Sequence, residues 1–399
     1  MRSPPHLSAG IISILLLCAG TLVFDVYVGS LENRYVNALA PLGLIQTING
    51  IALQQAAVQR PDLLLVYGSS DVMMADTPYN AKHFFATYPT GFTVFQVANL
   101  GTSSLNIAQY IAAIDSDLHG KKIVISVSPA NFFIGNFYGK NFSPICANKL
   151  IFSTHLSMRL KIDTARRMNH YEDTLQNDPL LRFAIVQLTG TSMTNRVLYV
   201  LSWPLGELHI LIMRFQEHAE IMFYLQSHPV DPDVKKIPQK IDWSTTLAGA
   251  LADQKGHTGS NPFGIEDDHW AKYQYLMNNS VPAGSGDADF IRLIKTYPEW
   301  GDLDILQRVL QERGAQPLIL SRPMNVHLWE AMGVSEQAQN SYYAKLHKTI
   351  NQQFSLLVDL HQYGRDIYFS TDQYSHTSRE GWVYIDQILD AFYHGQLHP

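Results

Sequence analysis

The sequence predicts an α/β protein in which helices flank a parallel sheet. Short apolar runs at residues 63–67, 92–97 and 123–127 each end in a turn. Between the second and third runs, residues 104–118 carry apolar side chains at helical spacing. Strands that alternate with helices at this pace are typical of a parallel, doubly wound sheet.

The strand pattern stops after the third run and returns near the carboxyl terminus. Residues 145–300 are mostly helical and loop-like in pattern, and we interpret them as an insertion. Apolar runs at 317–320 and 366–369 predict two further strands. We therefore divide the chain into a terminal anchor, a linker and one large domain that contains the insertion, at residues 1–30, 31–61 and 62–399.

The first segment predicts a membrane anchor. No charged residue occurs from Leu7 to Phe24, and a helix that continues to Val28 is about 33 Å long, enough to cross a bilayer. Arg2 precedes the span, which favours a single-pass, N-in orientation with the large domain outside the cytoplasm. The alternative is a cleaved signal peptide, but bulky residues follow the apolar run where a small-residue cleavage site would stand.

Composition excludes several classes of protein. The apolar share of 46% is ordinary for a globular core, and the net charge of −6 gives no basic surface for nucleic acid. The two cysteines are Cys18, inside the apolar segment, and Cys146, so we expect no intramolecular disulfide.

The sequence also gives no motif for a cofactor. A cluster of possible metal ligands lacks the tight spacing of a metal site: His257, Asp267, Asp268 and His269. No glycine-rich phosphate loop or dinucleotide fingerprint is present. We therefore expect neither a metal nor a nucleotide cofactor.

A second apolar-rich stretch runs from Phe183 to Leu225. Charged residues and Pro204 interrupt it, and we interpret it as buried helices of the large domain. The alternative is a membrane-facing surface, because the predicted anchor would hold the domain close to the bilayer.

Two segments at opposite ends of the chain predict one active site. The run at 63–67 leads into Gly68-Ser69-Ser70-Asp71, and a late loop carries Asp372 and His376. A buried strand that stops at glycine and serine can present a nucleophile at the sheet edge, and Gly-x-Ser places Ser70 at the top of the turn. Histidine and aspartate supply a base and the group that orients it. Each segment alone is more often an ordinary turn or polar loop, but together they favour acyl transfer or ester cleavage.

Acyl transfer also needs donors for the oxyanion that forms on the attacked carbonyl. The backbone N–H groups at Ser70 and Gly101, and the side chain of Asn131, would follow three neighbouring strands at the same sheet edge. Glycine lets its amide approach a substrate closely. A plain turn glycine and a capping asparagine are the alternatives at these two positions.

These residues resemble the DltD family of D-alanyl-lipoteichoic acid biosynthesis proteins, which are membrane-anchored members of the SGNH-like hydrolase group. Besides the anchor, the resemblance rests on motifs whose order and spacing extend over nearly the whole chain. They are Gly68-Ser69-Ser70-Asp71, Ile125-Ser126-Val127-Ser128-Pro129, Asn261-Pro262-Phe263-Gly264-Ile265, Glu299-Trp300-Gly301-Asp302-Leu303, Arg322-Pro323-Met324-Asn325, Tyr342-Tyr343, and His376 before Gly381-Trp382.

The resemblance implies a catalytic set of Ser70, His376 and an acid just before the histidine. It also implies work beside a membrane-bound O-acyltransferase, DltB, in moving D-alanine onto a cell-surface polymer. The chain departs from the family pattern in two places. Gln373 stands where the acid is expected and Asp372 is one residue earlier, and the block that carries an asparagine donor ends in Ala130-Asn131.

The resulting hypothesis is a membrane-anchored serine acyltransferase or esterase acting through a D-alanyl-Ser70 intermediate. Its partners would be a DltB-like acyltransferase, a D-alanyl donor and a polymer acceptor. Two alternatives remain at this stage: a hydrolase of D-alanyl or O-acetyl esters, and a non-catalytic assembly factor for the membrane acyltransferase.

Overall fold

The computed structural model describes residues 5–42, 50–73, 77–114, 118–133, 138–232, 237–259, 261–277, 279, 281–372 and 374–397. Its helices and strands follow one another in this order: α1 (Pro5–Leu39), η1 (Ala40–Leu42), α3 (Ala52–Gln59), β1 (Leu63–Gly68), α4 (Ser70–Met73), α5 (Ala81–Thr87), β2 (Thr93–Ala98), α6 (Ser104–Ala113), β3 (Lys122–Val127), η3 (Pro129–Phe132), η4 (Tyr138–Asn141), α7 (Pro144–Phe152), α8 (Met158–Met168), α9 (Glu172–Leu175), α10 (Pro179–Thr189), α11 (Met193–Ser227), α12 (Trp243–His257), α13 (Asp267–Trp270), η5 (Gln274–Met277), α14 (Asp287–Thr296), α15 (Glu299–Glu312), β4 (Gln316–Ser321), α16 (Val326–Ala331), α17 (Glu336–Thr349), β5 (Leu356–Asp359), η6 (His361–Arg365) and α18 (Arg379–Tyr393).

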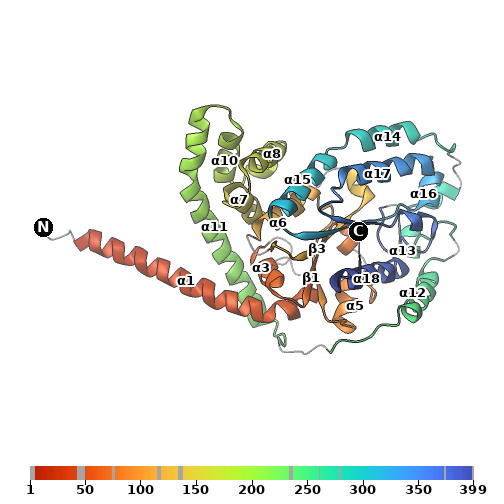
Figure 1. Ribbon diagram of the computed structural model, residues 1–399, viewed down its shortest axis with the longest axis horizontal. Helices are drawn as coiled ribbons and strands as arrows, with labels where there is room; N and C mark the ends of the chain where they lie inside the picture. Colours follow the sequence, from red (N-terminus) through yellow and green to blue (C-terminus); the bar gives the residue numbers. More distant parts are fainter. Residues whose placement is uncertain are drawn as a thin grey trace.

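The centre of the molecule is a five-stranded sheet, so the predicted α/β class with a parallel sheet flanked by helices is confirmed. The strands lie in the order β2-β1-β3-β4-β5, and each neighbouring pair is parallel (Figure 1). The order reverses between β1 and β3. In open parallel sheets, ligands bind outside the carboxyl ends of the strands at such a reversal.

Helices cover both faces of the sheet, which explains why its strands are continuously apolar. Successive side chains of β1 alternate between two cores: Leu63, Leu65 and Tyr67 pack with α3, α6 and α15, whereas Leu64 and Val66 pack with α5 and α18. A strand buried on both faces needs apolar side chains at odd and even positions alike.

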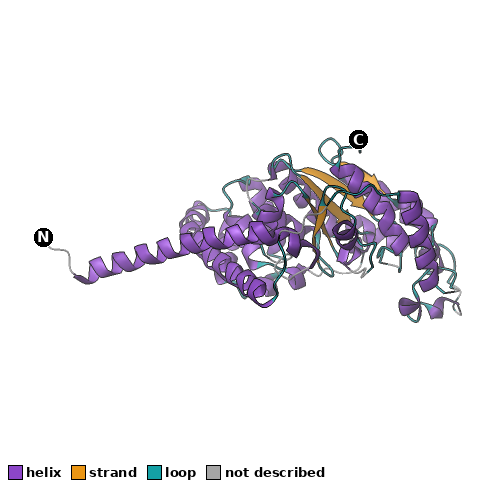
Figure 2. Cartoon of the chain, turned by 90° about the horizontal axis from the view of Figure 1, so that it is seen from below, coloured by secondary structure: helices purple, strands orange, loops and turns teal. Residues whose placement is uncertain are grey.

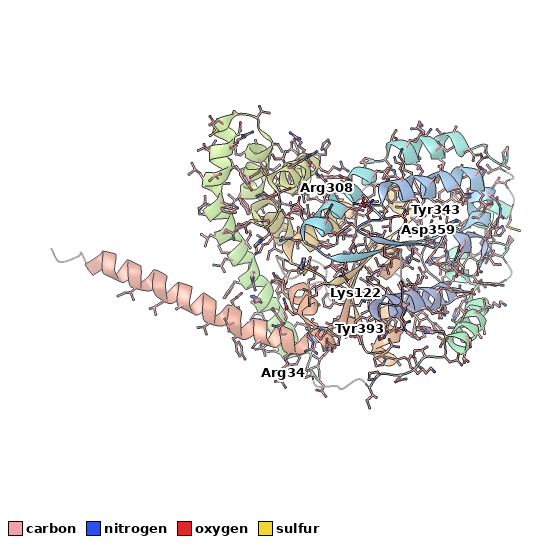
Figure 3. All side chains as sticks on the ribbon, viewed as in Figure 1. Arg34, Lys122, Arg308, Tyr343, Asp359 and Tyr393 are labelled. Carbon is pink, nitrogen blue, oxygen red and sulfur yellow. The ribbon has the colours of Figure 1, made fainter. Side chains whose placement is uncertain are left out.

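The carboxyl-terminal helix is fastened to the amino-terminal edge of the sheet. Lys122, at the start of β3, donates from Nζ to the backbone oxygens of Phe392 (2.9 Å) and Tyr393 (2.8 Å), near the end of α18. The Tyr393 hydroxyl donates to the backbone oxygen of Pro61 at 2.6 Å. Figure 3 labels both Lys122 and Tyr393 in this region. These bonds hold the last helix against the chain that enters β1.

The predicted strand at 366–369 is wrong. These residues form a turn, in which the Asp366 carboxylate accepts from the Tyr368 N–H at 3.0 Å and the Asp366 carbonyl from the Phe369 N–H at 3.2 Å. An aspartate that bonds the N–H two residues on favours a turn over a strand. The fifth strand is β5, a four-residue edge strand that is only half-buried and pairs with β4.

Helix α1 extends beyond the predicted anchor and enters the domain. Its amino-terminal part projects from the body of the molecule, while its carboxyl-terminal part lies against it (Figures 1 and 2). Val36 and Leu39 are fully buried in the same core as α3. The predicted linker, 31–61, is therefore helical over much of its length, and residues 43–49 lie outside the described part. Several side chains in the predicted span are also outside it, so the anchor stays a prediction.

The predicted insertion is helical, as its pattern indicates, but the interpretation of 183–225 as buried helices is wrong for α11. This helix is long and apolar enough to cross a membrane, and only 22% of its most apolar window is buried. One face of α11 packs on the domain and the other is exposed.

The burial of α1 predicts that its carboxyl-terminal part stabilises the domain. We expect Leu39→Ala to lower the free energy of unfolding by about 2–5 kcal/mol, because the substitution leaves a cavity in the core. Chemical denaturation of the full chain in detergent, followed by tryptophan fluorescence, measures the loss. Asn33→Ala, at an exposed position of the same helix, is the control and should change stability by about 0.5 kcal/mol or less. Equally small effects of both substitutions would contradict this role.

Candidate active site

The structure brings Ser70, His376 and Asp372 into one hydrogen-bonded row. The Ser70 hydroxyl oxygen lies 2.9 Å from His376 Nε2, and His376 Nδ1 lies 2.7 Å from Asp372 Oδ2. Asp372 is buried, whereas the side chain of His376 is 12% exposed and Ser70 is half-buried. The Ser70 hydroxyl is thus partly accessible to solvent, whereas the Asp372 carboxyl group is shielded from it.

The serine lies in a tight turn that only glycine permits at its start. A Cβ atom on Gly68 would lie 2.3 Å from Val72 Cγ2 and 3.2 Å from Ser126 Cβ. Asp71 closes the turn by accepting the Ser69 N–H at 3.0 Å. Ser69 is buried, so Ser70 is the serine that this turn presents to His376.

A narrow loop explains how an aspartate four residues before the histidine can reach it. Ser370 and Thr377 form an antiparallel bridge, and the Thr371 N–H donates to the His376 carbonyl at 2.8 Å. Inside the loop, Asp372 Oδ1 accepts from the Tyr374 N–H at 2.8 Å. Ser375 has φ of +63°, in the left-handed region, which lets the chain reverse within so few residues. Gln373 lies outside the described residues.

The proposed oxyanion donors come from neighbouring turns. Gly68 pairs in register with Ala98, so the turns at Ser70 and Gly101 leave the same sheet edge. Gly101 has φ of +73°, a conformation that favours glycine. Asn131 follows β3 in η3 and is half-buried, with its Nδ2 3.4 Å from the Thr102 carbonyl. Its side chain therefore faces the β2 turn.

Sequence reasoning missed a buried ion pair behind the serine. Arg322 Nε lies 3.3 Å from Asp71 Oδ2, and both side chains are 1% exposed. The same Nε donates to Ser126 Oγ at 2.8 Å, and Ser126 in turn donates to Asp71. Arg322 Nη1 donates to Thr377 Oγ1 at 2.8 Å, so one guanidinium joins the serine turn to the histidine loop. A charged residue directly after the end of β4 was the available signal.

Burial dominates the electrostatics around this guanidinium. It lowers the pKa of Arg322, although the carboxylate of Asp71 opposes the shift. The guanidinium also lies 5.1 Å from the ring centroid of Trp382, within the range of a cation–π contact. Asp386, on α18, is fully buried, and burial raises the pKa of its carboxyl group well above the ordinary value. We therefore expect the carboxyl group of Asp386 to be neutral.

Fold and site together define an α/β protein with a serine, a histidine and an aspartate in hydrogen-bond contact at the carboxyl edge of a parallel sheet. Within the residues described, no three histidine, cysteine, aspartate or glutamate side chains gather as metal ligands would.

Comparison with known proteins identifies the family. The family model described as DltD protein matches residues 45–394, so this chain belongs to the DltD family. It is 28% identical over 353 residues to Protein DltD of Bacillus subtilis (strain 168), covering 86% of each chain. It is 22% identical over 358 residues to Protein DltD of Staphylococcus aureus (strain NCTC 8325 / PS 47), covering 89% of this chain and 87% of the other.

The buried ion pair predicts a large difference between two arginine substitutions. We expect Arg322→Met to lower the free energy of unfolding by about 3–5 kcal/mol, because it leaves the Asp71 carboxylate buried without a counter-ion. Arg60, which pairs with Asp62 at 2.9 Å in a half-exposed position, gives the matched control. Arg60→Met should cost about 1 kcal/mol or less. If urea unfolding gave similar losses of unfolding free energy for the two variants, the buried pair would not be a special source of stability.

Proposed function

We propose that this protein is a membrane-anchored serine acyltransferase or esterase that transfers D-alanine onto a cell-surface polymer of the teichoic-acid type. The observation that carries the chemistry is the Ser70–His376–Asp372 row of hydrogen bonds. The motifs shared with the DltD family support the choice of D-alanine as the acyl group.

In the first half-reaction, Ser70 Oγ attacks the carbonyl carbon of an activated D-alanyl group. His376 Nε2 takes the hydroxyl proton, and Asp372 stabilises the resulting imidazolium through Nδ1. The tetrahedral intermediate then collapses, the bond to the donor's leaving group breaks, and the proton on His376 passes to that group. The product is a D-alanyl ester on Ser70.

The second half-reaction reverses these roles. A polymer hydroxyl gives its proton to His376 and attacks the Ser70 ester, and Ser70 leaves as its hydroxyl when the proton returns. In both halves, backbone N–H groups at Ser70 and Gly101 would stabilise the oxyanion. Asn131 would join them only if its amide turns from the Thr102 carbonyl, which is 3.4 Å away.

The proposed location follows from the apolar amino-terminal half of α1. We place residues 7–28 across the membrane with the amino terminus inside and the domain outside. A DltB-like membrane acyltransferase would then deliver the D-alanyl group on the side of the membrane where Ser70 lies.

Ser70 should be the residue that reacts as a nucleophile. A serine-reactive fluorophosphonate is expected to label the wild type on a Ser70 peptide and to leave Ser70→Ala unlabelled, because His376 activates only this hydroxyl. Peptide mass spectrometry identifies the labelled residue. Ser69→Ala, in the same turn, is the control and should still be labelled. A label found on Ser69 would overturn the assignment.

Asp372 should be essential for turnover although it stands one residue from the family's usual position. We expect Asp372→Asn to reduce turnover by about 10⁴-fold, since a neutral amide cannot stabilise the imidazolium. The rate of D-alanyl ester formation or cleavage measures this loss, with circular dichroism to verify the fold.

Gln373→Ala is the control and should leave turnover almost unchanged. If Asp372→Asn instead kept its turnover and Gln373→Ala lost it, the site would lack a working acid. That result would favour a scaffolding role.

A further inference from the structure

Helix α11 packs against the domain with one face only. Tyr199 donates from its hydroxyl to the Ile151 carbonyl at 2.6 Å, and Trp203 Nε1 donates to the Phe152 carbonyl at 2.7 Å. One turn further along α11, a Cβ on Gly206 would lie 2.6 Å from the ring of Phe152, the last residue of α7. Helices α7 and α11 are therefore in close contact at this point. These contacts fix which side of α11 faces away from the domain.

The outward side of α11, with the neighbouring side of α10, is a large exposed apolar surface, here called the α10–α11 face. Its side chains range from 37% to 65% exposed: Phe183, Val186, Val197, Leu198, Val200, Leu201, Leu205, Leu208, Leu211, Ile212 and Phe215. Within residues 197–213, all of which are described, Glu207 is the one exposed charged residue. Soluble monomers rarely expose an apolar patch of this extent, and such a patch marks an interaction surface.

The α10–α11 face is continuous with the projecting part of α1. Phe24 and Phe215 pack with ring centroids 4.5 Å apart, and Arg214 Nε pairs with Asp25 at 3.0 Å. Toward its amino terminus α1 leaves the domain and exposes more apolar side chains, among them Leu16 and Val23. In Figure 1, α11 lines the side of the domain from which α1 projects. A membrane entered by α1 would meet α11 first.

Two arginines lie beside the amino-terminal end of α11. Arg166 and Arg196 line a cavity of about 480 Å³ there, beside Tyr199 and Val200, and Arg166 also pairs with Asp163 at 3.5 Å. Arginine at the rim of an apolar face suits the phosphate groups of lipids, with the apolar side chains below them.

We propose that the α10–α11 face lies in the lipid–water interface of the membrane. Its apolar side chains would enter the acyl-chain boundary by roughly 5–10 Å, and the two arginines would contact lipid phosphates. Together with α1, this contact fixes the orientation of the domain as well as its distance from the membrane. The inference rests on the membrane anchor of the proposed function and not on the proposed acyl-transfer chemistry.

Site-directed fluorescence in vesicles tests this contact with the full chain. In a Cys18→Ser background, with Cys146 buried, single cysteines replace Leu205 on the α10–α11 face, Leu16 on α1 and Ala248 on α12. Helix α12 lies on the opposite side of the domain in Figure 1. Each variant is labelled with bimane and reconstituted into phosphatidylglycerol–phosphatidylcholine vesicles that carry a spin label on an upper acyl carbon.

We expect the spin-labelled lipid to quench more than half of the fluorescence at Leu205 and at Leu16, and little at Ala248. The vesicles contain no other protein, so quenching at Leu205 means contact with lipid. Quenching at Leu16 without quenching at Leu205 would overturn the inference, as expected if a second copy of the chain covers the face. An unquenched label at both leucines would overturn the membrane anchor as well.

Discussion

The buried pair of Asp71 and Arg322 is the interaction on which the site depends. Asp71 belongs to the serine turn, Arg322 follows β4, and the same guanidinium reaches Thr377 beside His376. Three parts of the chain that are far apart in sequence therefore meet at the guanidinium group of Arg322. An ion pair without solvent is stable only when its hydrogen bonds are nearly complete, and Ser126 supplies bonds to both partners. A small shift of either partner would move the serine relative to the histidine.

Close packing holds the same geometry from the other side. A Cβ on Gly381, in the first turn of α18, would lie 2.4 Å from the Phe369 carbonyl and 2.9 Å from Thr377 Cγ2. The start of α18 therefore presses on both strands of the histidine loop. Gly68 plays a similar part beneath Ser70. With no room for a side chain at either glycine, the positions of Ser70 and His376 are set by close packing as well as by charge.

The sequence could predict the elements with strong local signals. Apolar runs buried on both faces identified β1 to β4, and the glycine before Ser70 identified the turn that presents it. The short, half-buried β5 has too weak an apolar pattern to be predicted as a strand. The residues at 366–369 have the apolar pattern of a strand, but local periodicity does not reveal that Asp366 closes a turn there. The Asp71–Arg322 pair could not be predicted for another reason. No local sequence pattern shows which charged residues meet when they are 251 positions apart in the chain. Exposure of α11 also depends on tertiary contacts, since apolar content alone fits a buried helix equally well.

The central claim is that Ser70 carries the acyl group during transfer, and intact-protein mass spectrometry tests it most directly. The full chain in detergent would be mixed with a D-alanyl thioester, quenched with acid and analysed beside Ser70→Ala. We expect a mass increase of one D-alanyl group on the wild type, located at Ser70 by peptide mapping, and no increase on the variant. Equal modification of both proteins, or an unmodified wild type that still catalyses transfer, would contradict it.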